Sequence, residues 1–383
     1  MLNVAACVAL PELERLRAEW DALLSSASNA SIFATWEWVE ACWRYPAPSR
    51  QPFVLVARNE QGRLVGVLPL ARTSRLGFIQ VLEVLGCTHH GYPMGDYGGL
   101  VAERGGHAAV WYAMLKFMKS KWWMLIDMSN CMAGPPEAEE QTARNYKAPA
   151  DSLGVWLQVQ SAEPCRVVPL PCTFDVYLAE LSSNGRQNIR RKLRKLANDG
   201  HTIERVDAKD LAARTEALQA LFELHQERWE DKEAGGGFPE GRIRDLHHHL
   251  AANLAERGYL DLRIVRSAEG NVVAVIYNYR YGDTVYYYHM GSSQSEPWTA
   301  YSLGTCLIAD SIEGAINDGY KTFDLLRGDH DYKRHFGGYS TATLRVMVYR
   351  YNWLPRAEGL LRTLRGRLSD RAGVAMQAEP QAQ

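Results

Sequence analysis

Charged and polar side chains crowd together just after Asp324. The segment KTFDLLRGDHDYKRHFGG has the pattern of a strand that ends at this aspartate. The next ten residues supply Arg327, Asp329, Tyr332, Lys333 and Arg334, which can bind anions or move protons. Ligands of open α/β sheets bind outside the carboxyl ends of the strands, which favours a functional interpretation. The structural alternative is that Asp324 caps a turn and Lys333 lies on a solvated helix face.

A helix suited to phosphate is expected before this strand. Ser302, Gly304 and Thr305 stand at the start of the helical pattern SLGTCLIADSIEGAIN. A helix start presents backbone N–H groups and the positive end of the helix dipole, which together bind phosphate or pyrophosphate. Ser302 is also an ordinary N-cap residue. The strand TVYYYHMGSS, which precedes this helix, carries His289 among aromatic residues.

Two further helical patterns could hold ligands. In LFELHQERW, His225, Arg228 and Trp229 share one helix face, which would line an acceptor pocket or form a buried edge. The loop at 231–241, DKEAGGGFPEG, could close over a substrate. Between Arg186 and Lys195, six of ten residues are basic and none is acidic, which predicts an anion- or RNA-binding helix or a merely solvated face.

Histidine and cysteine spacing predicts no metal site. His247, His248 and His249 are consecutive, so on a helix they point about 100° apart. Cys87, His89 and His90 lack a fourth ligand. The seven cysteines include no C-x-x-C pair, which indicates no disulfide framework and a reducing, cytoplasmic location.

Composition indicates a globular protein. The 383 residues, 46% of them hydrophobic, predict two or three domains at about 150 residues each. The net charge of −1 argues against a general nucleic-acid binder. No apolar run approaches the roughly 18 residues of a membrane span.

The chain contains a weak internal repeat. Placing Gly62 on Gly270 aligns VARNEQGRLVGVL with IVRSAEGNVVAVI, and in each half a helical stretch then leads to a strand that ends in aspartate, Asp127 or Asp324. Each half therefore predicts a mixed α/β (α+β) lobe with a largely antiparallel sheet flanked by helices.

The repeat divides the chain into residues 1–165, an N-terminal lobe, and 166–350, a C-terminal lobe. The polar, proline-bearing stretch 132–150 is expected to be a loop or linker. Residues 351–383 are expected to form an amphipathic helix and tail, because leucines recur at helical spacing among arginines. This helix would contact an inner-membrane surface or a partner, or pack on the C-terminal lobe.

Several sequence segments resemble those of a known family. FELHQERW, SLGTCL, FDLLRGDHDYK and RQNIRRKLRKL resemble the CelD-type acetyltransferases of the GNAT superfamily, and are similar to FemAB-like transferases with two GNAT-like lobes. In the first half, FATWEWVEACW and VLGCTHHGYPMGDYGG carry the likeness. The resemblance implies tandem GNAT-like lobes and acyl transfer from acetyl-CoA, or another acyl-CoA, to an amine or hydroxyl, with a saccharide of polysaccharide biosynthesis as the acceptor. Of the GNAT phosphate loop, only the central Gly304 is in place.

The resemblance also suggests roles for the residues above. The base would be His289 or Asp324, and the acid Tyr332, because GNAT enzymes often place a tyrosine near the CoA sulfur. Arg327 or Lys333 would hold phosphate together with the helix start. One alternative is a FemAB-like aminoacyl transferase whose basic helix grips aminoacyl-tRNA. Another is a non-catalytic GNAT-fold binding module.

Overall fold

The computed structural model describes residues 1–75, 78–87, 95–134, 138–229, 238, 241–351, 353 and 355, without the side chains of 228 and 229. Three sequence predictions fall largely outside this description: the helix expected within 351–383, the loop at 231–241, and the histidines at 89 and 90.

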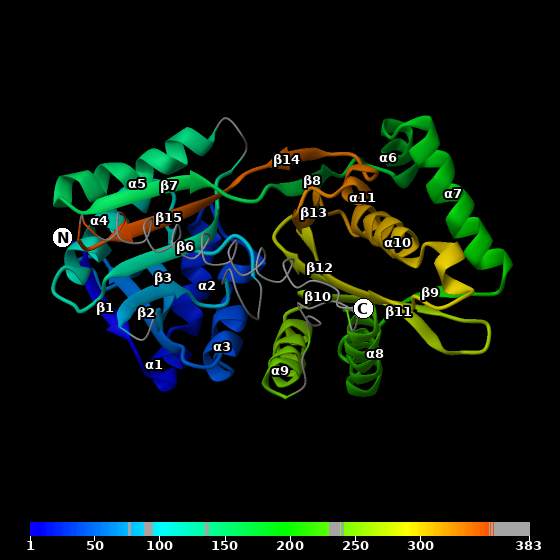
Figure 1. The fold of residues 1–383 in the computed structure, drawn as a ribbon, viewed down its shortest axis with the longest axis horizontal. Helices are drawn as coiled ribbons and strands as arrows, with labels where there is room; N and C mark the ends of the chain where they lie inside the picture. The colour runs from blue at the N-terminus through cyan, green and yellow to red at the C-terminus, as the bar shows by residue number, and fades with distance from the viewer. Residues whose placement is uncertain are drawn as a thin grey trace, which may run out of the picture.

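Two lobes lie side by side, each built on one sheet (Figure 1). The N-terminal part forms β1 (Asn3–Cys7), α1 (Leu10–Arg15), α2 (Arg17–Ser26), η1 (Ile32–Ala34), α3 (Trp36–Arg44), β2 (Gln51–Arg58), β3 (Leu64–Arg75), β4 (Ile79–Val84), β5 (Val101–Ala102), α4 (His107–Met118), β6 (Leu125–Met132), α5 (Glu139–Leu153) and β7 (Trp156–Ser161). The C-terminal part forms β8 (Cys165–Pro169), α6 (Phe174–Glu180), α7 (Ser183–Asn198), β9 (Thr202–Arg205), α8 (Leu211–Trp229), α9 (Arg242–Glu256), β10 (Leu260–Arg266), β11 (Val272–Tyr281), β12 (Thr284–Ser292), η3 (Trp298–Tyr301), α10 (Leu303–Asn317), β13 (Thr322–Arg327), α11 (Asp331–Arg334), β14 (Tyr339–Thr341) and β15 (Thr343–Tyr349).

The two sheets have the same strand order, which confirms the predicted fold class. The first runs β1-β2-β3-β4-β6-β15-β7, with β5 beside β3, and the second runs β9-β10-β11-β12-β13-β8-β14. In each sheet one neighbouring pair is parallel, β4 with β6 and β12 with β13, and the other pairs are antiparallel. The aligned glycines occupy equivalent hairpins: Gly62 and Gly270 both have positive φ, +79° and +91°, as tight turns require.

The lobes exchange one strand each. β8 follows β7 in sequence but pairs with β13 and β14 in the second sheet. β15 follows β14 but returns to the first sheet, between β6 and β7. Residues 343–349 therefore lie in the first lobe, whereas the sequence-based division placed them in the second. Strand pairing decides this point, because the chain order alone does not say which sheet a terminal strand joins.

The expected loop at 132–150 is largely a helix, so this prediction was wrong. Helix α5 covers Glu139–Leu153 and buries Tyr146 and Ala150. Its low apolar content and Pro149 suggested a loop, but glutamate, glutamine and alanine are strong helix formers and the proline stands near the C-terminal end. The Trp111 indole of α4 donates to the carbonyl of Tyr146 at 3.1 Å, which ties α5 to the lobe.

A continuous hydrophobic core joins the lobes. Phe33 of η1 and Trp38 of α3 pack against Tyr279 of β11 and Tyr288 of β12, with ring centroids 5.8 to 6.3 Å apart. A second buried cluster lies between the other face of the second sheet and helices α6, α7 and α10. The relative position of the lobes is therefore fixed by packing.

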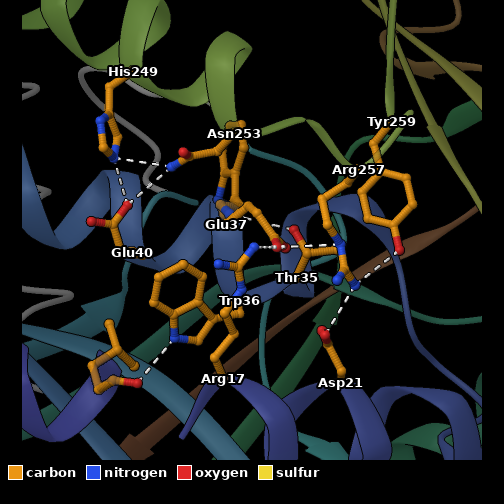
Figure 2. A network of polar contacts seen from close by, with 12 residues as sticks. Arg17, Asp21, Thr35, Trp36, Glu37, Glu40, His249, Asn253, Arg257 and Tyr259 are labelled. Carbon is orange, nitrogen blue, oxygen red and sulfur yellow. Dashed lines mark hydrogen bonds and ion pairs between the residues drawn. The ribbon is translucent and has the colours of Figure 1, made fainter. Parts of the chain in front are cut away.

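Two buried glutamates of α3 add polar contacts between the lobes (Figure 2). Glu37 contacts Arg17 at 3.0 Å and Arg257, which follows α9, at 3.4 Å. Glu40 contacts Arg44 at 2.6 Å and His249 of α9 at 2.7 Å. Burial alone would raise the pKa of Glu40, but the hydrogen bonds from His249 and Arg44 outweigh it and lower that pKa.

Replacing Glu40 with glutamine is expected to lower the free energy of unfolding by about 2 kcal/mol at pH 7, because Arg44 and His249 lose the buried carboxylate that they contact. Since folding lowers its pKa, the contribution of Glu40 is complete above its ordinary pKa of 4.5 and disappears as the pH falls through the folded value. Urea unfolding should therefore show a difference in the free energy of unfolding between the native protein and Glu40→Gln at pH 7, and a smaller difference below pH 4. Glu14→Gln, which alters an exposed partner of Arg44, is the control. Equal effects of the two changes would contradict this account.

Candidate functional site

In each lobe the two parallel strands separate after the same structural position. β12 and β13 pair over Thr284–Tyr286 and Thr322–Asp324, although β12 continues to Ser292. In the first lobe, β4 and β6 pair over Val81–Glu83 and Leu125–Asp127. Asp324 and Asp127 thus occupy the same place, the last paired residue before the strands part. The carboxyl ends of parallel strands are where ligands bind in open sheets.

In the first lobe this aspartate is locked by arginines. Asp127 accepts bonds from Arg345 at 2.8 and 2.6 Å and from Arg75 at 2.6 Å. Burial would raise its pKa, but the two guanidinium groups lower it below the ordinary value. Asp127 is therefore a structural group that is charged at neutral pH.

In the second lobe the equivalent aspartate has neutral hydrogen-bond donors. The Tyr97 hydroxyl donates to one oxygen of Asp324 at 2.7 Å, and the backbone N–H of Leu326 donates to the other at 2.8 Å. Burial raises the pKa of Asp324 to about 7, although both hydrogen bonds oppose the shift. A carboxyl group that changes protonation near neutral pH suits general acid–base catalysis.

The first lobe completes this site with two residues that the sequence analysis did not identify. One is Tyr97, which donates to Asp324, and the other is Asp96, which forms an ion pair with Arg327 of β13. Tyr97 has a left-handed φ of +53°, a conformation that costs energy outside glycine and is often found at functional sites. The available signal was the acidic–aromatic pair in the glycine-rich GDYGG. Nothing in the sequence places it beside Asp324.

The two cations expected to hold phosphate have other partners. Arg327 is engaged by Asp96. Lys333 is buried, and its ammonium donates to the carbonyls of Leu325 at 2.7 Å, Leu326 at 3.3 Å and Arg327. An ammonium has three donors, so these bonds use all of them. Lys333 thereby supports the bulged end of β13, where Leu326 has a φ of +57°. The role of Arg327 and Lys333 in holding phosphate stays a prediction.

Tyr332 lies at the surface of α11. Its side chain is 43% exposed, and its ring stacks on His330 with centroids 6.1 Å apart. Asp324, by contrast, is buried. The role of Tyr332 as an acid stays a prediction.

His289 belongs to an aromatic cluster near this site. Tyr277 pairs with His289 and the next residue of β11 pairs with Tyr287, so Tyr288 is the extra residue of a β-bulge. The His289 ring lies 5.6 Å from His225 of α8 and 4.8 Å from Phe238. Burial, with His225 and His247 nearby, holds the pKa of His289 well below its usual range. A base works best with a pKa near the operating pH, so Asp324 suits that role better.

The predicted phosphate helix and the predicted basic helix come together. Lys192 of α7 donates to the hydroxyl of Ser302, the residue that precedes α10. Burial lowers the pKa of Lys192. Gly304 faces β12: a Cβ there would lie 2.6 Å from the Met290 methyl, so this glycine lets α10 approach the strand. Thr305 follows on the first turn of α10 and is partly exposed.

The structure describes only part of the acceptor face that was predicted on α8. His225 is buried beside His289, while the side chains of Arg228 and Trp229 lie outside the described residues. Among the described residues, no group of three or more histidine, cysteine or acidic side chains could hold a metal ion. Within that same part of the chain, no helix has the length and apolar content to cross a membrane.

Comparisons with known proteins agree with the fold. A family profile described as "Acetyltransferase (GNAT) domain" matches residues 183–334. No curated protein sequence matches the chain. Among solved structures, FemX has a TM-score of 0.63 at 14% identity, covering 91% of this chain and 98% of its own.

Two other structures share the fold over nearly their full length. The C-terminal domain of a putative lysylphosphatidylglycerol synthetase from Agrobacterium fabrum has a TM-score of 0.53 at 12% identity, covering 90% of this chain and 93% of its own. A conserved protein of unknown function from Bacteroides thetaiotaomicron has a TM-score of 0.55 at 10% identity, covering 91% and 100%. The region that holds α7, α10 and Asp324 therefore matches the acetyltransferase (GNAT) domain family, and the chain as a whole has a fold similar to that of FemX.

Proposed function

We propose that the second lobe transfers an acyl group from acetyl-CoA, or another acyl-CoA, to an amine or hydroxyl acceptor, with Asp324 as the general base. The observation that carries this proposal is the contrast between two equivalent aspartates. Asp127 is fixed as a carboxylate by two arginines, while Asp324 has a pKa of about 7. Groups at equivalent positions whose environments separate their pKa values indicate which one does acid–base work.

In the proposed reaction, the acceptor nitrogen or oxygen attacks the thioester carbonyl carbon. The C–S bond breaks as the new C–N or C–O bond forms, and the acceptor proton goes to the Asp324 carboxylate. Tyr97 and Leu326 use two of the roughly four lone-pair positions of a carboxylate, which leaves capacity for that proton. The departing thiolate takes a proton from the solvent or from Tyr332, the acid that the GNAT resemblance suggests.

The donor phosphates would bind where α7 meets the start of α10. Lys192 supplies a positive charge beside Ser302, and the first turn of α10 supplies backbone N–H groups. The resemblance to CelD-type proteins favours a saccharide or amino-sugar acceptor on the side of His225, and a cytoplasmic place in polysaccharide biosynthesis.

Replacing Lys192 with methionine is expected to weaken acetyl-CoA binding about tenfold, because one charge-assisted hydrogen bond to phosphate is lost. Isothermal titration calorimetry with acetyl-CoA measures this directly. Lys209→Met removes one exposed lysine elsewhere in the same lobe and is the matched control. If the two variants bind acetyl-CoA equally well, the phosphate site lies elsewhere.

The second candidate donor is aminoacyl-tRNA, which the basic surface of α7 favours. Arg190, Arg191, Arg194 and Lys195 are all exposed on this helix, more positive charge than one pyrophosphate needs. Arg190 is paired with Asp175 at 2.9 Å, so Arg191 and Arg194 are the residues to reverse. If RNA is the ligand, Arg191→Glu with Arg194→Glu abolishes tRNA binding, and native binding falls steeply with salt. Binding of neither donor would favour a non-catalytic module.

A further inference from the structure

Five large aromatic side chains are exposed at the outer end of the first lobe. We name them the aromatic rim: Phe78, Trp122, Trp156, Tyr351 and Trp353. Trp122 is 68% exposed, Phe78 65% and Trp353 56%. Single exposed apolar residues are normal on a protein surface, but a group of neighbours marks an interaction site.

Strand register places the rim residues together. Val81 of β4 pairs with Leu125 of β6, and Phe78 and Trp122 each stand three residues before this pair, just ahead of two adjacent strands. Tyr349 of β15 pairs with Leu125 on one side and with Trp156 of β7 on the other.

The chain leaves β15 at the same end of the sheet. Tyr351 and Trp353 follow the strand directly, and their rings stack with centroids 6.1 Å apart. This end of the lobe, with β15 and α4, faces away from the second lobe (Figure 1). The rim is therefore remote from the proposed active site.

Positive charges border the rim. Arg350 donates to the backbone carbonyls of Lys121 and Lys119, the latter at 3.2 Å, and so holds this segment against the end of β15. The side chains of Lys116, Lys119 and Lys121 are exposed. One exposed acidic residue, Asp151 of α5, lies near Leu153, whose carbonyl accepts from the Lys119 ammonium at 3.0 Å. The border is positive on balance.

Charge decides between the possible occupants of this surface. A second copy bound through the same face would bring lysines against lysines. The chain beyond Pro355 carries Arg356, Arg362, Arg365, Arg367 and Arg371 against Glu358, Asp370 and Glu379, so it too is positive on balance. Both alternatives would bring positive charges against positive charges. An anionic surface instead attracts both the lysines that border the rim and the arginines of the following segment.

We propose that the aromatic rim docks on an anionic lipid surface. Tryptophan and tyrosine prefer the headgroup level of a bilayer, where an apolar ring and a polar edge are both satisfied. Exposed lysines and arginines beside them gain about 1 kcal/mol each from anionic lipid, or roughly fivefold in binding. This surface is a feature of the folded first lobe and does not depend on the proposed reaction.

The test measures sedimentation of the full-length chain with vesicles of phosphatidylcholine containing 30% phosphatidylglycerol, compared with phosphatidylcholine alone. We expect binding to the anionic vesicles only. Trp122→Ala combined with Trp353→Ala should weaken it at least about tenfold, because both rings lose contact with the interface. Lys119→Glu combined with Lys121→Glu should weaken it at least as much.

The matched control combines Leu211→Ala with Tyr339→Ala, two exposed residues of the other part of the molecule, and should leave binding unchanged. Arg362→Glu with Arg365→Glu in the full-length chain separates the rim from the segment beyond it. Absence of native binding to anionic vesicles would overturn the proposal. So would binding that survives both rim variants, self-association through the rim without vesicle binding, or binding of a short RNA at the rim in place of lipid.

Discussion

Replacing Asp324 with asparagine is expected to lower the rate of acyl transfer by about 100- to 10,000-fold while the chain stays folded. The amide keeps the size of the carboxyl group but cannot take the acceptor proton. Thiol release from acetyl-CoA with glucosamine as the acceptor measures the rate. In the native protein the rate should fall as the pH drops through about 7, where Asp324 becomes protonated.

Asp127→Asn is the matched control, because the repeat places both aspartates at the same position. It removes the charge that Arg75 and Arg345 share, so we expect a loss of about 3 kcal/mol in the free energy of unfolding. Activity per folded molecule should be retained. Equal losses of activity in the two variants, or near-native activity of Asp324→Asn, would contradict the assignment of the base.

Stability offers a readout of Asp324 that needs no substrate. Because folding raises its pKa from 3.8 to about 7, the folded state holds a proton that the unfolded state releases between these values. Its contribution is complete below pH 3.8 and is lost as the pH rises through 7. Asp324→Asn avoids this loss, so the variant should gain stability relative to the native protein between pH 5 and pH 8. Asp127, whose pKa is lowered, should show the opposite trend in acid.

Replacing Gly338 with alanine is expected to destabilise the protein by about 3 kcal/mol or more. A Cβ at this position would lie 2.0 Å from the carbonyl oxygen of Val167, and Gly338 has a φ of +72°. The contact is with the backbone of β8, the strand that the second lobe receives by exchange, so no flexible side chain can relieve it. Arg166 also binds the carbonyls of Gly337 and Gly338 at 2.8 and 3.0 Å.

Gly319→Ala is the control for this change. Gly319 has a similar φ of +82°, but nothing lies within 4 Å of a Cβ built there. Only the backbone preference is lost, at about 1 kcal/mol. Chemical denaturation of both variants separates the steric from the conformational cost. Effects of equal size would mean that β8 moves to accommodate the methyl group, and that the exchanged strand is not tightly held.

The sequence by itself determined the two central hairpins, several helices and their repetition. Alternating apolar residues around Gly62 and Gly270 specify two hairpins, because turn chemistry and side-chain periodicity act over a few residues. The basic run of α7 and the start of α10 were likewise visible as local patterns. The α5 prediction failed because a mostly solvated helix lacks the apolar stripe that the pattern depends on.

The tertiary structure alone decided which residues meet. Tyr97 and Asp324 are 227 positions apart, so their hydrogen bond depends on the packing of two lobes and not on any local pattern. The same holds for Lys333: one alternative of the sequence analysis placed it on a solvated helix face, but it is buried at the bulged end of β13. The repeat made Asp127 and Asp324 equivalent in sequence. Burial raises the pKa of both carboxyl groups. Two arginines outweigh it at Asp127, whereas at Asp324 the tyrosine from the opposite lobe only opposes it, because an uncharged donor stabilises a carboxylate less than a guanidinium does.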